Sequence, residues 1–506
     1  MTIREVRDEV RSGARSASDV CRAALARIDA VNPQLNAFNT VAADRALARA
    51  DAIDRDRTRW RDAPLAGVPI ALKDNICTRG VRTTASSRML EHYTPPYDAT
   101  VVARLESAGA VIVGKTNCDE FAMGSSNETS AFGPVHNPWA LDRTPGGTSG
   151  GSAAAVAARL IPAALGSDTG GSIRQPSSLC GVVGLKPTFG RVSRYGLIAH
   201  GSSLDQIGPI ARTAYDAAIV LGVLAGTDEA DSTSVPEPVP DYMAALSGDV
   251  RGVRIGVPRA LLEQGVDPEV AAATSAALER LKARGAALVD IELPHARYAT
   301  PVYYLVSTAE ASSNLARYDG VRYGFRSKPH VADGAARAVT HDLRHMYART
   351  RAQGFGAEVK RRIMLGTYVL SAGYYDAYYL KAQQVRTLIL RDYDRAFERV
   401  DAVAMPTSPV PAFRIGERVA DPLQMYLIDV FTVSANLTGL PAISIPCGFT
   451  RPPSLDGAPS SSGAAGLPIG LQLTGRRFDE ATLLRVADAY ERDTTWATQL
   501  PPIPSR

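Results

Sequence analysis

The chain has 506 residues and a formal net charge of +4, from 56 Lys and Arg against 52 Asp and Glu. This near balance gives no sign of an extended nucleic-acid surface. Five widely spaced cysteines match neither a disulfide framework nor a zinc motif, and the first ten residues lack the apolar core of a signal peptide. No apolar run reaches the roughly 18 residues that a membrane span requires. We therefore expect a soluble, cytoplasmic protein without a metal site.

The predicted strands and helices alternate along the chain. The predicted strands are apolar runs at 69–72, 111–113, 253–257 and 402–405. Residues 20–31 and 273–288 have the period of helices. This alternation predicts one large α/β domain over residues 1–506, with a core of about 20–490 and a sheet covered by helices.

Two later segments have a different composition. Residues 304–390 are helical in period and rich in tyrosine, and we expect a lid or side layer with most tyrosines in the core. Residues 451–465 are rich in Pro, Ser, Gly and Ala, which predicts a flexible surface insertion.

Lys73 is unusual because it closes an apolar run, 68–72, and precedes the turn pair Asp74-Asn75. Burial lowers the pKa of a lysine, so a buried amine can accept a proton near neutral pH. Lys73 is therefore a candidate general base, with an ion pair to Asp74 or Asp168 as the alternative. His136 and His200, in turn-rich segments, are weaker candidates.

Two glycine-framed hydroxyl clusters, at 146–152 and 167–174, flank the apolar run 153–165. Glycine permits close approach of the backbone, and a Thr-Gly-Gly-Ser loop that enters a helix offers backbone N–H groups to an oxyanion. Serine needs a neighbouring base to act as a nucleophile. The two clusters together predict a hydrolytic active site.

Three other motifs are weaker. Residues 109–116 fit the pattern G-x-x-x-x-G-K-T, but their middle is itself a predicted strand, which argues against a phosphate loop. Residues 147–151 fit the G-x-S-x-G elbow of α/β-hydrolases, yet a turn-rich segment precedes them where that elbow needs a strand. Cys180 has apolar neighbours, which favour a buried, unreactive thiol.

With these residues the chain resembles the amidase signature family, whose members use a lysine, a serine next to a cis peptide bond and a nucleophilic serine. The resemblance places the lysine at Lys73 and the nucleophile at Ser172. The bridging position falls on Thr148, where the family has serine, and Ser149 is the alternative. A threonine hydroxyl can still donate and accept. The resemblance implies a mixed central sheet covered by helices on both faces, and an oxyanion hole from the backbone of Thr169, Gly170, Gly171 and Ser172.

Four segments, at 119–133, 356–379, 421–429 and 466–472, resemble the glutaminase subunits of tRNA-dependent amidotransferases within that family. The substrate contacts that this implies are Gly124, Ser125, Tyr304, Arg362 and Asp429. Free glutamine is a zwitterion, so its site needs one cation and one anion far from the nucleophile, and Arg362 and Asp429 fit those roles. Without the resemblance they would be interpreted as a helix-surface arginine and a loop aspartate.

The resemblance also implies partners. We expect a B-type subunit that uses ATP and Mg²⁺, a small C-type subunit in a heterotrimer, tRNA held mainly by the partner, and no cofactor on this chain. The product would be amidated Glu-tRNA(Gln), Asp-tRNA(Asn) or both. Two alternatives stay open: a stand-alone amidase of broader specificity, and a catalytically silent scaffold subunit.

Overall fold

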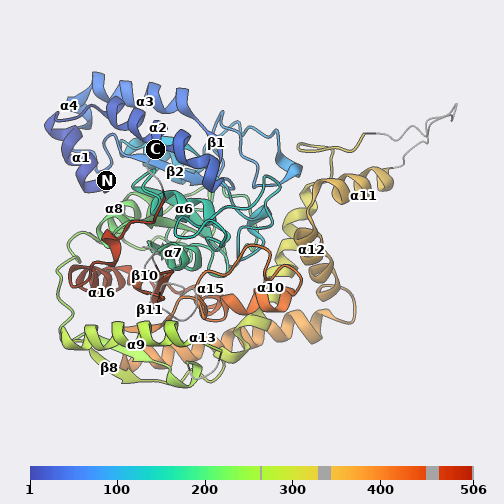
Figure 1. Cartoon of the computed structure of the whole chain (residues 1–506). Coiled ribbons are helices and arrows are strands. Elements are labelled where there is room, and N and C mark those ends of the chain that lie inside the picture. The colour runs from blue at the N-terminus through green and yellow to red at the C-terminus, as the bar shows by residue number, and fades with distance from the viewer. Residues whose placement is uncertain (263–264, 329–342, 452–465, 504–506) are drawn as a thin grey trace, which may run out of the picture.

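The computed structural model describes residues 1–262, 265–328, 343–451 and 466–503 (Figure 1). Most of the predicted insertion 451–465 thus lies outside the described residues. The α-helices are α1 Ile3–Ser12, α2 Ala17–Leu35, α3 Ala43–Arg55, α4 Arg57–Trp60, α5 Thr100–Ser107, α6 Gly150–Ala157, α7 Arg174–Cys180, α8 Ala214–Leu224, α9 Pro268–Ala283, α10 Ala299–Asn314, α11 Leu343–Gly354, α12 Ala357–Val369, α13 Lys381–Arg399, α14 Pro422–Tyr426, α15 Val433–Thr438 and α16 Glu480–Arg492.

The strands are β1 Phe38–Val41, β2 Pro69–Lys73, β3 Val111–Thr116, β4 Ala163–Asp168, β5 Val183–Lys186, β6 Gln206–Ala211, β7 Arg254–Val257, β8 Ala287–Asp290, β9 Ala402–Pro406, β10 Ala442–Phe449 and β11 Pro468–Gly475. Short helical turns lie at η1 Arg88–Leu90, η2 Glu120–Ala122, η3 Arg259–Leu261, η4 Ala296–Tyr298, η5 Leu315–Arg317, η6 Tyr375–Leu380, η7 Leu427–Asp429 and η8 Trp496–Thr498.

Within the described residues, eleven strands form one sheet in the order β1-β3-β2-β4-β6-β5-β10-β11-β9-β7-β8. β2 pairs in parallel with β3 and β4, and β7 pairs in parallel with β8 and β9. The remaining neighbours are antiparallel. The predicted mixed α/β sheet is confirmed.

Helices cover both faces of this sheet. On one face, α6 packs on β2, β3, β4 and β6, and the adjoining α7 packs on β5, β10 and β11. On the other face, α8 packs on β5 and β6, and the adjoining α16 packs on β10 and β11. In Figure 1, α1 to α4 lie together at one end of the sheet, and α11 and α12 lie on the side away from α1 and α16. No helix in the described ranges is both long and apolar enough to cross a membrane.

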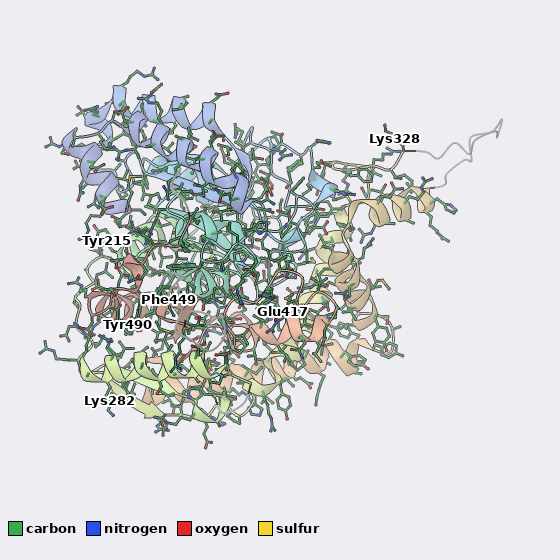
Figure 2. All side chains as sticks on the ribbon, in the orientation of Figure 1. Tyr215, Lys282, Lys328, Glu417, Phe449 and Tyr490 are labelled. Atoms are coloured by element: carbon green, nitrogen blue, oxygen red, sulfur yellow. The ribbon has the colours of Figure 1, made fainter. Side chains whose placement is uncertain are left out.

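Side chains fill the space between the layers (Figure 2). Phe449 of β10 packs edge-on against Trp139, with ring centroids 4.8 Å apart. Tyr490 of α16 is buried beside β10, where its hydroxyl donates to the Cys447 carbonyl. Lys282 and Lys328, by contrast, are exposed at the surface.

Two predictions at the level of elements were wrong. The helix predicted over 273–288 ends at Ala283, because Gly285 has a positive φ of 99° and the chain then enters β8 beside β7. The tyrosines of 304–390 are not mostly core: Tyr368, Tyr374, Tyr375 and Tyr378 are 39–48% exposed.

Candidate active site

Lys73 is the last residue of β2 and is fully buried. Its Nζ donates to Thr148 Oγ1 at 2.5 Å and to the Ser167 carbonyl at 3.2 Å. Burial lowers the pKa of this amine to about 8, against the opposing effect of Cys118, Asp119 and other acidic groups. The lysine therefore sits in the environment that a general base requires.

The alternative ion pairs for Lys73 are wrong. Asp74 lies 3.7 Å from Lys115 Nζ, and Asp168 lies 3.0 Å from Arg174 Nη2. In the described ranges, each of these carboxylates is thus paired with a cation other than Lys73.

The first glycine cluster presents Thr148, not Ser149, to the lysine. The Gly147–Thr148 peptide bond is cis, and the Thr148 carbonyl accepts from Asp119 N–H at 3.3 Å. The Ser149 hydroxyl donates instead to the Ser167 carbonyl at 3.2 Å. Of the two hydroxyls left open by the sequence, the Thr148 hydroxyl is the one hydrogen-bonded to Lys73.

Ser172 lies in the loop between β4 and α7, two residues before the helix begins. It is 7% exposed, and its carbonyl accepts from Ser149 N–H at 3.1 Å, so the two glycine clusters are bonded to each other. The structure thus brings together Lys73, Thr148, Ser149 and Ser172 from two loops and one strand end.

The backbone N–H groups before and at Ser172 fall into two sets. Gly171 N–H donates to Asp168 Oδ1 at 2.9 Å and is already satisfied. Those of Thr169, Gly170 and Ser172 have no acceptor among the described residues. Free donors in a buried loop are the groups an oxyanion needs. The available oxyanion donors are therefore Thr169, Gly170 and Ser172.

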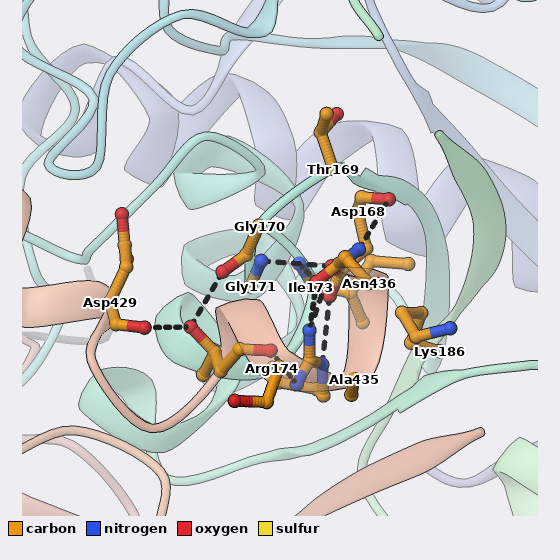
Figure 3. Close-up of polar contacts among 12 residues, drawn as sticks. Asp168, Thr169, Gly170, Gly171, Ile173, Arg174, Lys186, Asp429, Ala435 and Asn436 are labelled. Carbon is orange, nitrogen blue, oxygen red and sulfur yellow. Dashed lines mark hydrogen bonds and ion pairs between the residues drawn. The ribbon is translucent and has the colours of Figure 1, made fainter. Parts of the chain in front are cut away.

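A buried ion pair holds this loop (Figure 3). Arg174 bonds Asp168 through Nε and Nη2, both at 3.0 Å, and also reaches Asn436 Oδ1 at 2.7 Å and Gln472 Oε1 at 2.6 Å. Burial works against the charge of Asp168, yet Arg174 lowers the pKa of that carboxyl to about 2. Bidentate pairs of this kind fix geometry as well as charge.

A second group of predicted residues surrounds a cavity of about 240 Å³ that Gly124, Ser125, Arg362 and Tyr426 help to line. Ser125 Oγ donates to Asp429 Oδ2 at 2.6 Å. Burial raises the pKa of Asp429 to about 7, while Ser125 and Arg362 act in the opposite direction. A nearby cation would favour the ionised form of this carboxyl and lower its pKa, so Asp429 is suited to bind a cationic group.

Arg362 is 2% exposed and donates from Nε to Glu358 Oε1 at 2.8 Å. Its guanidinium carbon lies 5.4 Å from the Tyr304 ring centroid, and Tyr304 stacks on Tyr426 with centroids 3.9 Å apart. Tyr304 thus packs beside Arg362. Its own hydroxyl has no partner within the described part of the chain.

Three residues that support the site had no predicted role. Asp119 accepts from Asn127 N–H at 2.9 Å, and a side chain on Gly147 would collide with its carboxylate. Asp205 accepts from Thr169 Oγ1 at 2.7 Å. Tyr303 lies against Gly170, where an added Cβ would meet its hydroxyl. Asp119 falls within a segment, 119–133, that already resembled the family, whereas Asp205 and Tyr303 carried no separate signal.

The weaker motifs have structural roles. Residues 111–116 form strand β3, so 109–116 is no phosphate loop. Cys180 is buried, and burial raises the pKa of its thiol. His136 contacts the Leu141 carbonyl at 2.6 Å. Burial lowers the pKa of His200 well below its usual value.

Comparisons with known proteins agree with one another. The family model described as Amidase matches residues 19–484. The chain is 57% identical over 504 residues to the A-type subunit of glutamyl-tRNA(Gln) amidotransferase from Roseiflexus sp. (strain RS-1), covering 100% of this chain and 98% of that protein. It is 55% identical to the protein of the same name from Geobacter metallireducens, covering 99% and 98%.

Solved structures show the same relationship. The A-type subunit of glutamyl-tRNA(Gln) amidotransferase from Thermotoga maritima is 41% identical with a TM-score of 0.79, covering 100% of this chain and 98% of that chain. Native peptide amidase from Stenotrophomonas maltophilia is 32% identical with a TM-score of 0.79, covering 100% and 99%.

Proposed function

This chain belongs to the amidase family, and from its full-length similarity to A-type amidotransferase subunits we propose that it is the glutaminase subunit of a tRNA-dependent amidotransferase. The contact between the buried Lys73 amine and the Thr148 hydroxyl, 2.5 Å long, carries the proposal. A lysine whose pKa is lowered to about 8 and whose amine meets a hydroxyl can draw a proton through that hydroxyl.

The proposed chemistry uses this relay twice. Neutral Lys73 accepts, through Thr148, the proton of Ser172, and Ser172 Oγ attacks the carboxamide carbon of glutamine. The N–H groups of Thr169, Gly170 and Ser172 stabilise the oxyanion. The C–N bond then breaks, the relay returns the proton to the leaving nitrogen, and ammonia departs from a γ-glutamyl ester. Water, deprotonated by the same relay, attacks the ester carbon. The ester C–O bond breaks, the relay returns the proton to Ser172 Oγ, and glutamate departs.

We assign the selection of glutamine to Arg362 and Asp429 at the cavity of about 240 Å³. Arg362 would bind the α-carboxylate, and Asp429 with Ser125 would bind the α-ammonium group. Each charge-assisted hydrogen bond contributes about 1.5 to 3 kcal/mol, so an amide without either charge binds far more weakly. Gly124 and Ser125, which line the cavity, and Tyr304, which packs beside Arg362, would complete the substrate contacts.

The ammonia must be used elsewhere, since the proposed site holds no group that activates a carboxylate. We assign that step to a B-type partner subunit with ATP and Mg²⁺, assembled with a small C-type subunit in the cytoplasm. The partner would hold most of the tRNA, because the net charge of +4 on this chain is small. The acceptors are Glu-tRNA(Gln), Asp-tRNA(Asn) or both.

Amidation assays on the full chain test the proposal. With bacterial B-type and C-type subunits, ATP and Mg²⁺, we expect glutamine to support conversion of Glu-tRNA(Gln). Ser172→Ala should abolish the glutamine-dependent reaction and leave the ammonium-dependent reaction intact, because only ammonia supply is lost. Glutamine hydrolysis that ignores tRNA and partners would favour a stand-alone amidase. No glutamine hydrolysis by the unaltered chain under any condition would favour a scaffold.

A further inference from the structure

Thr432 lies between the two halves of the site. It is fully buried, in the turn that follows η7 and precedes α15. Its hydroxyl lies 2.6 Å from the Gly170 carbonyl and 3.0 Å from the Asp429 carbonyl. The two residues that this hydroxyl bonds, Gly170 and Asp429, are labelled in Figure 3. The Thr432 side chain thus connects the turn that contains Asp429 to the loop that contains Ser172.

The peptide between Gly170 and Gly171 is held at both ends. Thr432 Oγ1 donates to the Gly170 carbonyl, and Asp168 Oδ1 accepts from Gly171 N–H at 2.9 Å. Gly171 has a φ of 138°, which residues with side chains rarely adopt, and a side chain there would collide with Thr432. A glycine peptide is free to rotate unless such contacts hold it.

The orientation of this peptide matters because the free donors flank it. The N–H groups of Gly170 and Ser172 lie immediately before and after it, and neither has an acceptor in the described part of the chain. The two bonds to this peptide fix ψ of Gly170 and φ of Gly171, and a change in either dihedral would alter the direction of one free N–H group relative to the other. Loss of one oxyanion donor typically lowers kcat by about 100-fold to 1000-fold.

Thr432 is itself held in place by its neighbours. Its N–H donates to the Asp429 carbonyl at 3.0 Å, and its carbonyl accepts from Arg174 Nη1 at 3.0 Å. The preceding residue, Phe431, has its carbonyl bonded to Gln472 Nε2 at 2.7 Å. Removing the hydroxyl therefore frees the Gly170 carbonyl while the turn keeps these backbone contacts.

We propose that Thr432 is a positioning residue: its hydroxyl fixes the Gly170–Gly171 peptide and thereby aims the oxyanion donors beside Ser172. The inference rests on the proposed function in one respect, that Ser172 is the nucleophile. Thr432 does not touch the reacting atoms. It acts through the loop, so its loss slows the chemical step and leaves glutamine binding nearly unchanged.

Two near-isosteric variants separate the hydroxyl from the methyl group. Thr432→Val keeps the shape and removes the hydroxyl, while Thr432→Ser keeps the hydroxyl and removes the methyl. The first readout is the rate at which a small fluorophosphonate modifies Ser172 in the full chain, followed by intact mass. The second is kcat and KM for glutamine hydrolysis in the assembled enzyme.

We expect Thr432→Val to slow phosphonylation and kcat at least about tenfold, with KM within about twofold, and Thr432→Ser to react like the unaltered chain. Wild-type rates in Thr432→Val, or equal losses in both variants, would overturn the inference. If Thr432→Val fails to fold, Thr432→Ala against Thr432→Ser makes the same comparison. An unaltered chain that is never labelled at Ser172 would instead overturn the proposed function, and the inference with it.

Discussion

Lys73 has no carboxylate within ion-pair distance among the described residues, and its amine contacts only the Thr148 hydroxyl and the Ser167 carbonyl. Burial lowers its pKa to about 8. Because only the neutral amine accepts a proton, we predict that kcat for glutamine hydrolysis, measured at saturating glutamine, rises with pH through a midpoint near 8 and then levels. A pH profile from 6 to 10 measures the midpoint.

A charge variant tests whether Lys73 sets that midpoint. The negative charge of Asp119 raises the pKa of Lys73, so Asp119→Asn should move the midpoint to lower pH. Asp216→Asn serves as the control and should leave it in place, because this buried carboxyl is not among the main influences on Lys73. A midpoint that moves upward in Asp119→Asn would contradict the assignment of the base.

Thr148 and Ser149 differ in what their hydroxyls contact, and this difference predicts different losses. Thr148→Val removes the partner of Lys73 and should lower kcat by about 100-fold or more, since the proton has no path. Thr148→Ser keeps the hydroxyl and should stay active. Ser149→Ala removes only a bond to the Ser167 carbonyl and should remain within about threefold of the unaltered chain.

Glutamine hydrolysis by the three variants, with circular dichroism to confirm folding, decides between the two hydroxyls. If Ser149→Ala lost as much activity as Thr148→Val, the relay would have been assigned to the wrong residue. Retention of activity in Thr148→Val alone would exclude a relay through this position.

At this scale the sequence predicts residue types better than contacts. Lys73 stands out because a charge at the end of an apolar run is costly unless it serves a purpose. The choice between Thr148 and Ser149 depends on which way a glycine-rich backbone turns, and spacing along the chain does not specify that. The same holds for Asp205 and Thr432, whose contacts join segments more than 30 and 250 residues apart.

Helices α10 and α12 approach each other closely at Gly366. A side chain there would run into the Thr308 carbonyl of α10. Arg362 lies one turn earlier on α12 and lines the proposed glutamine cavity, while Tyr304 lies on α10 and packs beside Arg362. The spacing of these helices therefore sets the position of Arg362 in the cavity wall. Backbone atoms cannot yield as a flexible side chain does. The two helices must therefore separate to accept even one methyl group.

We predict that Gly366→Ala raises KM for glutamine about tenfold, with a smaller fall in kcat, and destabilises the fold by about 1 to 3 kcal/mol. Steady-state kinetics and denaturant unfolding measure these effects. Gly222→Ala on α8 is the matched control, because the nearest atom to its new Cβ is 4.0 Å away. That variant should gain about 0.5 to 1 kcal/mol and keep its KM. An unchanged KM in Gly366→Ala would show that the helix spacing does not govern binding.

Elements were predictable where the apolar pattern is long and unbroken. Runs such as 69–72 and 402–405 became β2 and β9 because a strand buried on both faces needs apolar residues at every position. The end of α9 at Ala283 could not be predicted, since both the end of this helix and the start of β8 are rich in Ala and Leu. The order of the strands in the sheet could not be predicted either, because β10 and β11 lie between β5 and β9, which are far from each other in the sequence.

Across the whole molecule, burial raises the pKa of several carboxyl groups into the neutral range. These values are about 6 for Asp119, about 7 for Glu120, about 6 for Asp216, about 7 for Asp429 and about 7 for Glu491. An unfolded chain releases these protons near pH 4 to 4.5. At pH values between about 4 and 7, the folded chain therefore binds more protons at these carboxyl groups than the unfolded chain does.

The sign of the stability change follows from this difference. Stability falls with rising pH wherever the folded state binds more protons, so the stabilisation from these groups is complete below about pH 4 and is lost as pH rises through 6 to 7. The buried basic groups His200, Lys73, Lys115 and Lys186 act in the opposite direction, because burial lowers the pKa of each. The pKa of His200 falls well below its usual value, that of Lys186 to about 7 and that of Lys73 to about 8. The five carboxyl groups outweigh these basic groups between pH 5.5 and 7.5, because Lys73 titrates above this window and Lys186 only in its upper half.

We therefore predict that the chain is more stable at pH 5.5 than at pH 7.5, measured by the midpoint of guanidinium unfolding. Asp216 provides a test outside the active site, because its Oδ1 accepts from Ile3 N–H and joins α1 to α8. Asp216→Asn imitates the protonated carboxyl at every pH, so its advantage over the unaltered chain should grow as pH rises through 6. A midpoint that increases from pH 5.5 to 7.5, or a variant whose advantage shrinks, would show that these carboxyl groups do not control the stability of the fold.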